Sequence, residues 1–220
     1  MWECRKSFSV DMLQDIQDAI EMQVSKELQQ QISFLMEIDE LKQVFRGAVL
    51  LKDLRAENDA EHSWHLAMMA ILLSKYSNDN DLDVLRTVKM VLIHDIVEID
   101  AGDTFCYSPH DRNQKTATER EAANRIFGLL PDDQANELRC LWEEFEEMKT
   151  PEARFAASVD RLQPLLLSFN TRGHTWLKYG VTRSQVIERN QYIERGSTML
   201  WELAKQLIDE SVQKGYLLDG

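Results

Sequence analysis

The chain has 220 residues, of which 44% are hydrophobic and 29% are charged, and its formal net charge is −13. This length allows one large domain or two small ones with a sizeable core, and the composition is that of a globular protein. The acidic surplus argues against nucleic acid as the main partner, because phosphate backbones are bound by an excess of lysine and arginine. It does not exclude a small phosphorylated ligand, since a local basic pocket or a metal ion can reverse the field.

The cysteines and the N-terminal segment indicate the compartment. Cys4, Cys106 and Cys140 lie far apart and form no CxxC pair, so they predict reduced thiols rather than a disulfide framework or a zinc ribbon. The segment MWECRKSFSV lacks the apolar core of a signal peptide, and no segment approaches the roughly 18 apolar residues of a membrane span. We therefore expect a soluble cytoplasmic protein with no membrane partner.

Apolar residues recur at helical spacing along most of the chain, and only 8 glycines and 4 prolines occur, which disfavours an all-β fold. We predict a long amphipathic helix over residues 10–35, which could form a dimer contact, and a short helix from Leu41 to Gly47. A loop over residues 50–59 then leads to a helix over residues 59–76. Asn58 and Glu61 predict a capping box at its start, and residues 77–81 end it.

Helical spacing continues in the second half of the chain. We expect a helix from Leu82 to just before Gly102, a polar loop over residues 104–115, and helices over 116–130, 131–148 and 151–169. Pro164 predicts a kink in the last of these. Residues 170–180 are expected to form a loop, and residues 184–214 a final helix. No repeat or linker is evident, so we predict one all-α domain over residues 1–220, with its core at residues 34–205 and the two terminal helices packed on it.

The segment VLIHDIVEID, residues 91–100, places ionisable side chains after an apolar run. His94 and Asp95 are adjacent, and Glu98 lies four and three positions further on, which puts it on the same helical face. An imidazole nitrogen and a carboxylate oxygen together suit a divalent transition metal. Two ligands are too few, so a metal site requires further histidine or aspartate on other apolar helices.

Two other apolar segments offer such residues. His62 lies in AEHSWHLAMMA, and Asp160 lies within the strongly apolar FAASVDRLQPLLL. Burial of an unpaired carboxylate is costly, so Asp160 needs a partner, and metal coordination is one common solution. Taken singly, each residue has an ordinary alternative as a core or surface polar group. Taken together, the three segments favour a metal site.

The remaining histidines are weaker candidates. His65 lies three residues after His62 and therefore on a neighbouring face, where a structural or supporting role is expected. His110 and His174 fall in predicted loops and are expected at the surface. His110 is the only histidine between the His-Asp pair and Asp160, so the sequence favours one metal ion rather than two.

On these residues the chain resembles the HD-domain metal-dependent phosphohydrolases. RAENDAEHSWHLAMMAILL, VKMVLIHDIVEIDAGDTF, LWEEFEE and TPEARFAASVDRLQPLL are similar to the branch that contains bacterial 5′-deoxynucleotidases and their eukaryotic HD-domain-containing relatives. The resemblance covers about residues 34–205. It implies a helical HD domain and hydrolysis of nucleoside 5′-monophosphates, with deoxyribonucleotides preferred, by means of one divalent metal ion. Donors of this type do not distinguish Mn, Co, Mg, Fe, Ni or Zn.

The resemblance also implies roles for individual positions. His62, His94, Asp95 and Asp160 match the metal ligands, and related proteins are often dimers. Glu98 matches the catalytic carboxylate, which would orient or deprotonate the attacking water or protonate the leaving 5′-oxygen. Asp103 matches a residue that faces the sugar near the reacting phosphate, and Arg46 matches an arginine that binds the nucleotide. Lys115 or Arg112, in the polar loop, could supply another charge to the phosphomonoester.

One departure concerns the nucleobase. The deoxynucleotidases usually have a tryptophan soon after the arginine, whereas this chain has FRGAVLLKD, so the base-stacking residue is open. Two alternatives to the nucleotidase also remain open. The first is a phosphodiesterase or pyrophosphohydrolase of the same superfamily, which longer basic loops would favour. The second is a non-catalytic helical interaction module clamped by a metal, which would need neither Glu98 nor Asp103.

Overall fold

The computed structural model describes residues 25–107 and 112–220, except for the side chains of residues 112–115. The α-helices in this part of the chain are α2 Lys26–Glu37, α3 Asp59–Leu73, α4 Val84–Ile93, α5 Glu98–Ala101, α6 Arg112–Phe127, α7 Asp132–Glu147, α8 Pro151–Asn170, α9 His174–Tyr179, α10 Arg183–Asn190, α11 Ile193–Gly196 and α12 Thr198–Gln213. Two 3-10 helices, η1 Ile38–Gln43 and η2 Ser74–Tyr76, and two short strands, β1 Phe45–Val49 and β2 Ala56–Asn58, complete it. The predicted all-α class is confirmed, with the two-stranded sheet as a small addition.

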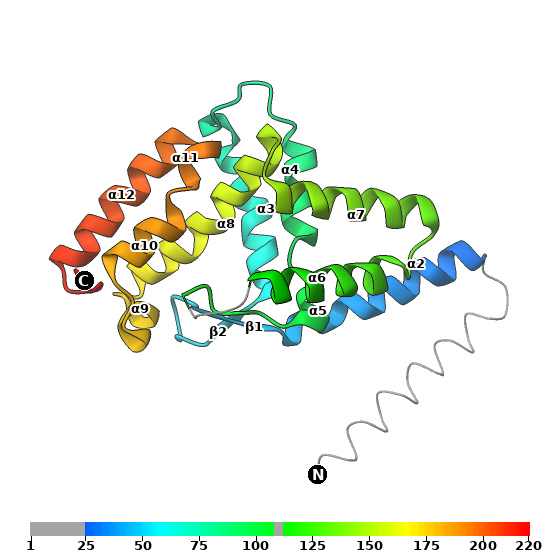
Figure 1. The fold of residues 1–220 in the computed structure, drawn as a ribbon, viewed down its shortest axis with the longest axis horizontal. Coiled ribbons are helices and arrows are strands. Elements are labelled where there is room, and N and C mark those ends of the chain that lie inside the picture. Colours follow the sequence, from blue (N-terminus) through cyan, green and yellow to red (C-terminus); the bar gives the residue numbers. More distant parts are fainter. Residues whose placement is uncertain (1–24, 108–111) are drawn as a thin grey trace, which may run out of the picture.

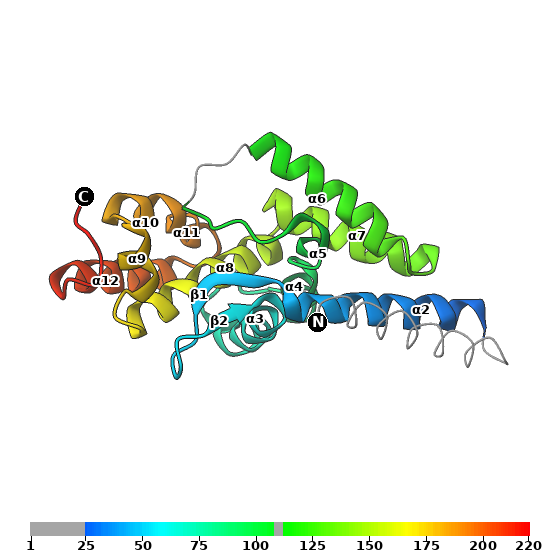
Figure 2. The ribbon, with the colours of Figure 1, turned by 90° about the horizontal axis from the view of Figure 1, so that it is seen from below.

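Helix α8 links the two ends of the molecule. In Figure 1, α9 to α12 gather at one end and α2, α6 and α7 at the other, and α8 extends from one group to the other. The turned view in Figure 2 shows the same separation. Buried residues on α8, among them Phe155, Val159 and Leu162, join one hydrophobic core with Leu66 of α3 and Met90 of α4.

Local chemistry explains where α8 begins. The Thr150 side chain accepts a hydrogen bond from the Ala153 backbone amide, and Pro151 occupies the first turn, where its missing N–H is not needed. Pro164 lies inside the helix, which continues to Asn170. Since proline has no N–H, residue 164 cannot donate the helical hydrogen bond to the carbonyl oxygen of Asp160.

Helix α3 also begins as predicted. The Asn58 side chain accepts from the Glu61 amide, and the Glu61 carboxylate accepts from the Asn58 amide, so the capping box is present. The helix ends at Leu73 and a 3-10 turn continues it to Tyr76. This start places residue 62 one turn inside the helix, on its buried side.

The predicted short helix from Leu41 to Gly47 is wrong beyond Gln43. Residues from Phe45 instead form β1, which pairs antiparallel with β2 inside the expected loop 50–59. A β-branched and an aromatic residue followed by glycine favour a strand over a helix. A short apolar run did not reveal this, because the strand depends on a partner some ten residues further on.

The predicted helix from Leu82 to Gly102 is divided. Between α4 and α5 the backbone forms hydrogen bonds three residues apart, from Ile96 to Ile93 and from Glu98 to Asp95. In such a 3-10 turn, residues three apart lie above one another. The break therefore aligns Glu98 with Asp95 more closely than a continuous α-helix would.

The C-terminal predictions need similar corrections. The expected loop 170–180 contains α9, which lies between Gly173 and Gly180, both in left-handed conformation. The expected helix 184–214 is three helices, because Ser197 is extended and caps α12 through the Leu200 amide. The first helix is described only from Lys26, so most of the predicted helix 10–35 lies outside the described residues.

Helices 116–130 and 131–148 correspond to α6 and α7, although α6 begins within the expected polar loop. Trp142, Phe145 and Trp201 are buried in the core. Within the described ranges, no helix is both long and apolar enough to cross a membrane.

We expect Gly196→Ala to destabilise the protein by about 1–3 kcal/mol. A Cβ at residue 196 would collide with the Arg154 carbonyl oxygen and the Ser158 hydroxyl of α8. Urea denaturation followed by circular dichroism measures the change in the free energy of unfolding. Thr198→Ala, at an exposed position two residues away, is the control and should stay within about 0.5 kcal/mol of the wild type. Equal effects of the two substitutions would contradict the packing argument.

Candidate metal centre

Two histidines and a carboxylate from three helices converge in the interior. His62 comes from α3, His94 is the C-terminal cap of α4, and Asp160 lies in the middle of α8. The distance from Asp160 Oδ1 is 3.1 Å to His62 Nε2 and 3.7 Å to His94 Nε2. One ligand atom from each residue lies within 4.8 Å of the others, a spacing that could hold a metal ion.

Asp95 lies against the same group. Its Oδ1 is 3.1 Å from His94 Nε2, and its Oδ2 is 3.8 Å from His62 Nε2. The four residues that the sequence predicted as ligands therefore meet around one position. We call His62, His94, Asp95 and Asp160 the His-Asp cluster.

The outer nitrogen of each imidazole is held by an acceptor. His94 Nδ1 lies 3.0 Å from the Val91 carbonyl oxygen, and His62 Nδ1 lies 3.1 Å from Gln163 Oε1. Each Nδ1 therefore carries the proton, and in a neutral ring each Nε2 presents a lone pair to carboxylate oxygens. In the described part of the chain His94 Nε2 has no hydrogen-bond partner. A cation between these groups would satisfy all of them, so the residues fit a divalent metal with nitrogen and oxygen ligands.

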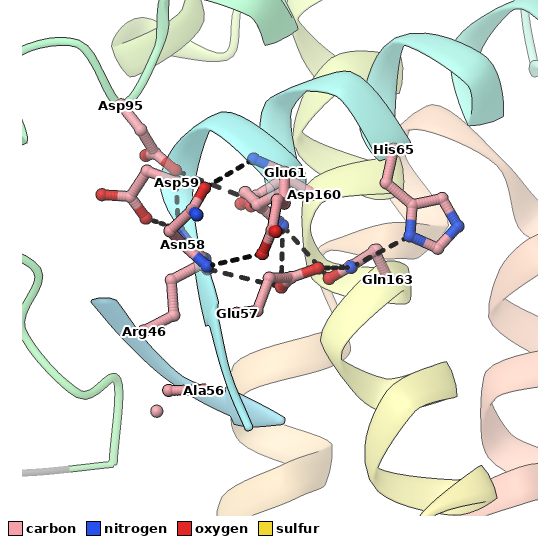
Figure 3. Close-up of polar contacts among 12 residues, drawn as sticks. Arg46, Ala56, Glu57, Asn58, Asp59, Glu61, His65, Asp95, Asp160 and Gln163 are labelled. Carbon is pink, nitrogen blue, oxygen red and sulfur yellow. Dashed lines mark hydrogen bonds and ion pairs between the residues drawn. The ribbon is translucent and has the colours of Figure 1, made fainter. Parts of the chain in front are cut away.

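Gln163 connects the cluster to another buried carboxylate. Its Nε2 donates to Glu57 Oε1 at 2.6 Å and lies 3.2 Å from His65 Nδ1 (Figure 3). Because the amide nitrogen is engaged there, Oε1 faces His62. Glu57 comes from β2 and Gln163 from α8, and both are buried. The hairpin and α8 thus orient His62 together.

Asp59, Asp95 and Glu98 form a second group, with oxygens within 4.8 Å of one another. Arg46 of β1 already places a positive charge there, since its Nη1 lies 2.6 Å from Asp95 Oδ2 and 2.9 Å from Asp59 Oδ1 (Figure 3). Burial raises the pKa of Asp59 to about 6, and the charge of Asp95 adds to this. Since Arg46 partly balances this second group, the His-Asp cluster is the better metal site.

The crowding of charge shifts the ionisation of the cluster. Although burial lowers the pKa of His94, the carboxylates of Asp95 and Asp160 raise it well above its ordinary value. Burial lowers the pKa of His62 to about 4. A proton on His94 therefore supplies positive charge where a metal ion would otherwise do so. The two compete, because both need the lone pair of Nε2.

The cluster opens onto a cavity of about 860 Å³, within the range of roughly 300–1,000 Å³ for small-molecule sites. Glu98, Asp103 and Arg46 line this cavity together with His94, Asp95 and Asp160 of the cluster, while His62 lies behind them in the interior. Burial and then the charges of Asp95 and Asp59 raise the pKa of Glu98 well above its ordinary value. The cavity thus places several ionisable groups beside the candidate metal ligands.

An aromatic ring lies against the strand that carries Arg46. A Cβ on Gly47 would lie 2.5 Å from Cδ2 of Phe105, so the absence of a side chain there allows the ring to contact β1. The Phe105 ring centroid is 4.4 Å from that of Tyr179 and 5.5 Å from that of Tyr107. Where a tryptophan was expected after Arg46, the chain has glycine, and Phe105 provides an aromatic surface in the cavity wall.

The family model of the HD domain matches residues 38–201. The chain belongs to the HD domain family. A crystal structure of a predicted metal-dependent phosphohydrolase from Magnetospirillum magnetotacticum MS-1 is 50% identical to it, with a TM-score of 0.83. The match covers 88% of this chain and 100% of that one. An HD-domain phosphohydrolase from Listeria innocua, 17% identical with a TM-score of 0.56 over 83% of this chain and 85% of its own, shares the fold.

Curated relatives in the family include nucleotidases. The human 5′-deoxynucleotidase HDDC2 is 32% identical over 136 residues, which are 61% of this chain and 65% of that protein. The 5′-deoxynucleotidase of Yersinia pestis is 26% identical over 118 residues, which are 50% of this chain and 59% of that protein. This HD domain chain therefore spans less than two thirds of the length of either relative.

The structure describes some of the predicted site residues outside the cluster but not others. Arg46, Glu98 and Asp103 line the cavity, whereas the side chain of Lys115 and the whole of His110 lie outside the described residues. The side chain of Arg112 lies outside them as well. His65 contacts Gln163. His174 is exposed, as expected, but it begins α9 rather than lying in a loop.

Three buried polar residues at the site were not predicted. Glu57 and Asp59 stand just before His62, and Gln163 follows Asp160 by three positions. The acidic segment AENDAE was the available signal, but residues 50–59 were expected to form a loop. Glu57 lies in the strand β2 and Asp59 is the first residue of α3; both are buried, where the sequence pattern alone did not place them.

We expect Gln163→Leu to weaken Mn²⁺ binding by about 10- to 100-fold, because the His62 ring loses the acceptor that holds its orientation. Titration calorimetry on metal-depleted protein measures the dissociation constant. Ser158→Ala is the matched control, since Ser158 is buried on the same helix but bonds to the Arg154 and Ile193 carbonyl oxygens. An unchanged dissociation constant in a folded Gln163→Leu protein would contradict the positioning role.

Proposed function

We propose that this HD domain chain is a metal-dependent phosphomonoesterase that hydrolyses nucleoside 5′-monophosphates, with deoxyribonucleotides preferred. The observation that carries the proposal is the His-Asp cluster, three of whose members, His94, Asp95 and Asp160, line a cavity that Arg46 and Glu98 also line. The human and bacterial relatives called 5′-deoxynucleotidase support the substrate class. The acidic net charge of −13 supports a small substrate rather than nucleic acid.

In this proposal His62, His94, Asp95 and Asp160 hold one divalent ion. Held there, such an ion would supply Lewis-acid chemistry, which reduces the repulsion between an anionic phosphate and its attacking nucleophile. Phosphate release with Mn²⁺, Co²⁺ and Mg²⁺ compared would identify the ion that supports the reaction. The presence of Arg46 between Asp59 and Asp95 supports one ion rather than two.

Glu98 is proposed as the group that transfers a proton. Burial, followed by the charges of Asp95 and Asp59, raises its pKa well above the ordinary value. A carboxyl group whose pKa is raised in this way suits protonation of the leaving 5′-oxygen. Asp103 lines the same cavity and is proposed to face the sugar beside the reacting phosphate.

Arg46 is proposed to bind the phosphate. Its Nε is buried without a hydrogen-bond partner among the described residues, so the guanidinium has donor capacity left beyond its contacts with Asp59 and Asp95. Guanidinium groups match phosphate oxygens in a bidentate manner. Phe105, on the adjoining wall, is proposed to contact the nucleobase, and Lys115 remains a proposed second charge for the phosphate.

We expect Asp95→Ala to lose bound metal and at least about a thousandfold in phosphate release, equivalent to about 4 kcal/mol of transition-state stabilisation. Glu98→Gln should keep the metal and lose about 10²- to 10⁴-fold in kcat, because only proton transfer is removed. Metal content by mass spectrometry and phosphate release from a panel of nucleotides measure both effects.

The control for these variants is Asp100→Asn. Asp100 lies on α5 with Glu98 but is exposed and pairs with Arg125, so its removal should leave both measurements near the wild-type values. Activity retained after complete metal depletion would overturn the proposed mechanism.

We further propose a homodimer in the cytoplasm. Trp64, Met68, Ile71 and Leu72 form an apolar stripe on α3 with exposed fractions of 64%, 38%, 51% and 64%. Exposed apolar patches of this kind mark interaction sites. The unpaired Cys106 and Cys140 support a reducing compartment.

Light scattering of the wild type should give twice the chain mass of 25.6 kDa. Trp64→Glu should reduce it to the mass of one chain, because a charge in an apolar contact is costly to bury. The control is Lys75→Glu, which changes charge on the exposed turn after α3. A single-chain mass for the wild type at all concentrations would contradict the dimer.

A further inference from the structure

Two partly buried arginines that line the cavity form no ion pair with a described carboxylate. Acidic residues outnumber lysine and arginine by 38 to 25, so carboxylate partners are plentiful. The arginines with described side chains that form ion pairs are Arg46, Arg55, Arg86, Arg125, Arg139 and Arg183. Of the others with described side chains, only Arg161 and Arg189 are partly buried, and the rest are exposed. Neither has an ion pair with any carboxylate in the described ranges.

Arg161 follows Asp160 on α8. Its Nη1 donates to the Ala157 carbonyl oxygen at 3.0 Å, and its Nη2 lies 3.7 Å from Met148 Sδ. Its Nε is buried without a hydrogen-bond partner in the described structure, and its guanidinium carbon lies 5.4 Å from the Tyr192 ring centroid. A partly buried guanidinium with an unused donor is costly, and an anionic acceptor would remove that cost.

Arg189 lies in the last turn of α10. It makes no hydrogen bond or ion pair with a described residue, yet it lines the same cavity as Arg161 and Tyr192. The charge of Arg189, second only to burial, lowers the pKa of Arg161, so the two guanidinium groups are close enough to repel each other. Two like charges in one cavity wall are stabilised by an anion placed between them.

These arginines are distinct from the group that meets the reacting phosphate. That phosphate is assigned to the His-Asp cluster and Arg46, which come from α3, the C-terminal end of α4, α8 and β1, whereas Arg189 comes from α10. Arg161 shares α8 with Asp160, but its guanidinium group lies against Met148 and Tyr192. The cavity of about 860 Å³ includes both regions. Glu146 and Glu188 also line it, which favours one compact anionic group over a long polyanion in this region.

We propose that Arg161 and Arg189 form a second anion subsite, so that the preferred substrate is a nucleotide with a phosphate in addition to the one removed. The proposal rests on the proposed phosphomonoesterase function and specifies its substrate. Two substrate forms share this chemistry. A nucleoside 3′,5′-bisphosphate carries the additional phosphate on the sugar, and a nucleoside 5′-diphosphate carries it next to the scissile one.

The test compares deoxyadenosine 5′-monophosphate, deoxyadenosine 3′,5′-bisphosphate and deoxyadenosine 5′-diphosphate on the metal-loaded full chain. The wild type should show a kcat/KM at least about tenfold higher for one doubly phosphorylated nucleotide than for the monophosphate, as expected for a charge-assisted hydrogen bond. Arg189→Gln should remove this preference, and Arg189→Lys should restore part of it. Whichever nucleotide shows the preference identifies the position of the additional phosphate.

Arg195→Gln is the matched control, because Arg195 stacks on the same Tyr192 ring at 4.5 Å but does not line the cavity. It should retain the preference. The same nucleotides are also titrated calorimetrically into chelator-treated protein, so that binding is measured without turnover. If phosphate is released from none of them, the proposed function fails, while the binding ratio still decides the subsite.

The proposed subsite would be overturned if the wild type showed no preference for either doubly phosphorylated nucleotide over the monophosphate, in kcat/KM and in calorimetric binding. An equal loss of preference in Arg189→Gln and Arg195→Gln would do so as well, since it would indicate a general effect on the Tyr192 region. Arg161→Gln is a secondary variant, because Arg161 also bonds to its own helix and its replacement could disturb folding.

Discussion

The placement of Asp160 in the middle of an apolar helix is the constraint on which the site depends. A buried carboxylate requires positive charge or donors around it, and here it meets the inner nitrogens of two histidines from other helices. Both imidazoles have their outer nitrogens engaged by acceptors, so neither can turn away without breaking a further hydrogen bond. The helices α3, α4 and α8 are therefore held together by these polar contacts as well as by apolar packing. A cation at the point where they meet would neutralise the negative charge of the carboxylates.

Arg46 provides part of that positive charge. Its guanidinium lies between Asp59 and Asp95 and has small exposure, with 13% of the side chain accessible. A metal ion held by Asp95 would weaken the pairing of that carboxylate with the guanidinium, so that Arg46 would have more donors for a phosphate. Metal binding and phosphate binding would then be coupled through one shared carboxylate, that of Asp95.

Helical periodicity was sufficient to predict the all-α class and most helices, because their apolar stripes and caps are local. It was insufficient for the β1–β2 hairpin, which depends on a pairing between segments. It was also insufficient for the helix breaks at residues 94–97, 191–192 and 197, which depend on tertiary contacts. The same distinction applies to the site. His62, His94, Asp95 and Asp160 stood out because ionisable groups on apolar helices are unusual. Glu57, Gln163 and Arg189 did not, because their significance comes from neighbours that are distant in sequence.

The contact between Gly47 and Phe105 has a consequence for how this cavity can change. The ring of Phe105 occupies the space that a side chain at position 47 would need. Two arrangements are therefore compatible with packing here. Either a small residue on the strand lies against an aromatic ring from the loop, or a large residue on the strand displaces the loop. Single substitutions at either position lead through a poorly packed intermediate. Sequences that differ in the aromatic surface beside Arg46 are therefore expected to differ at both positions together.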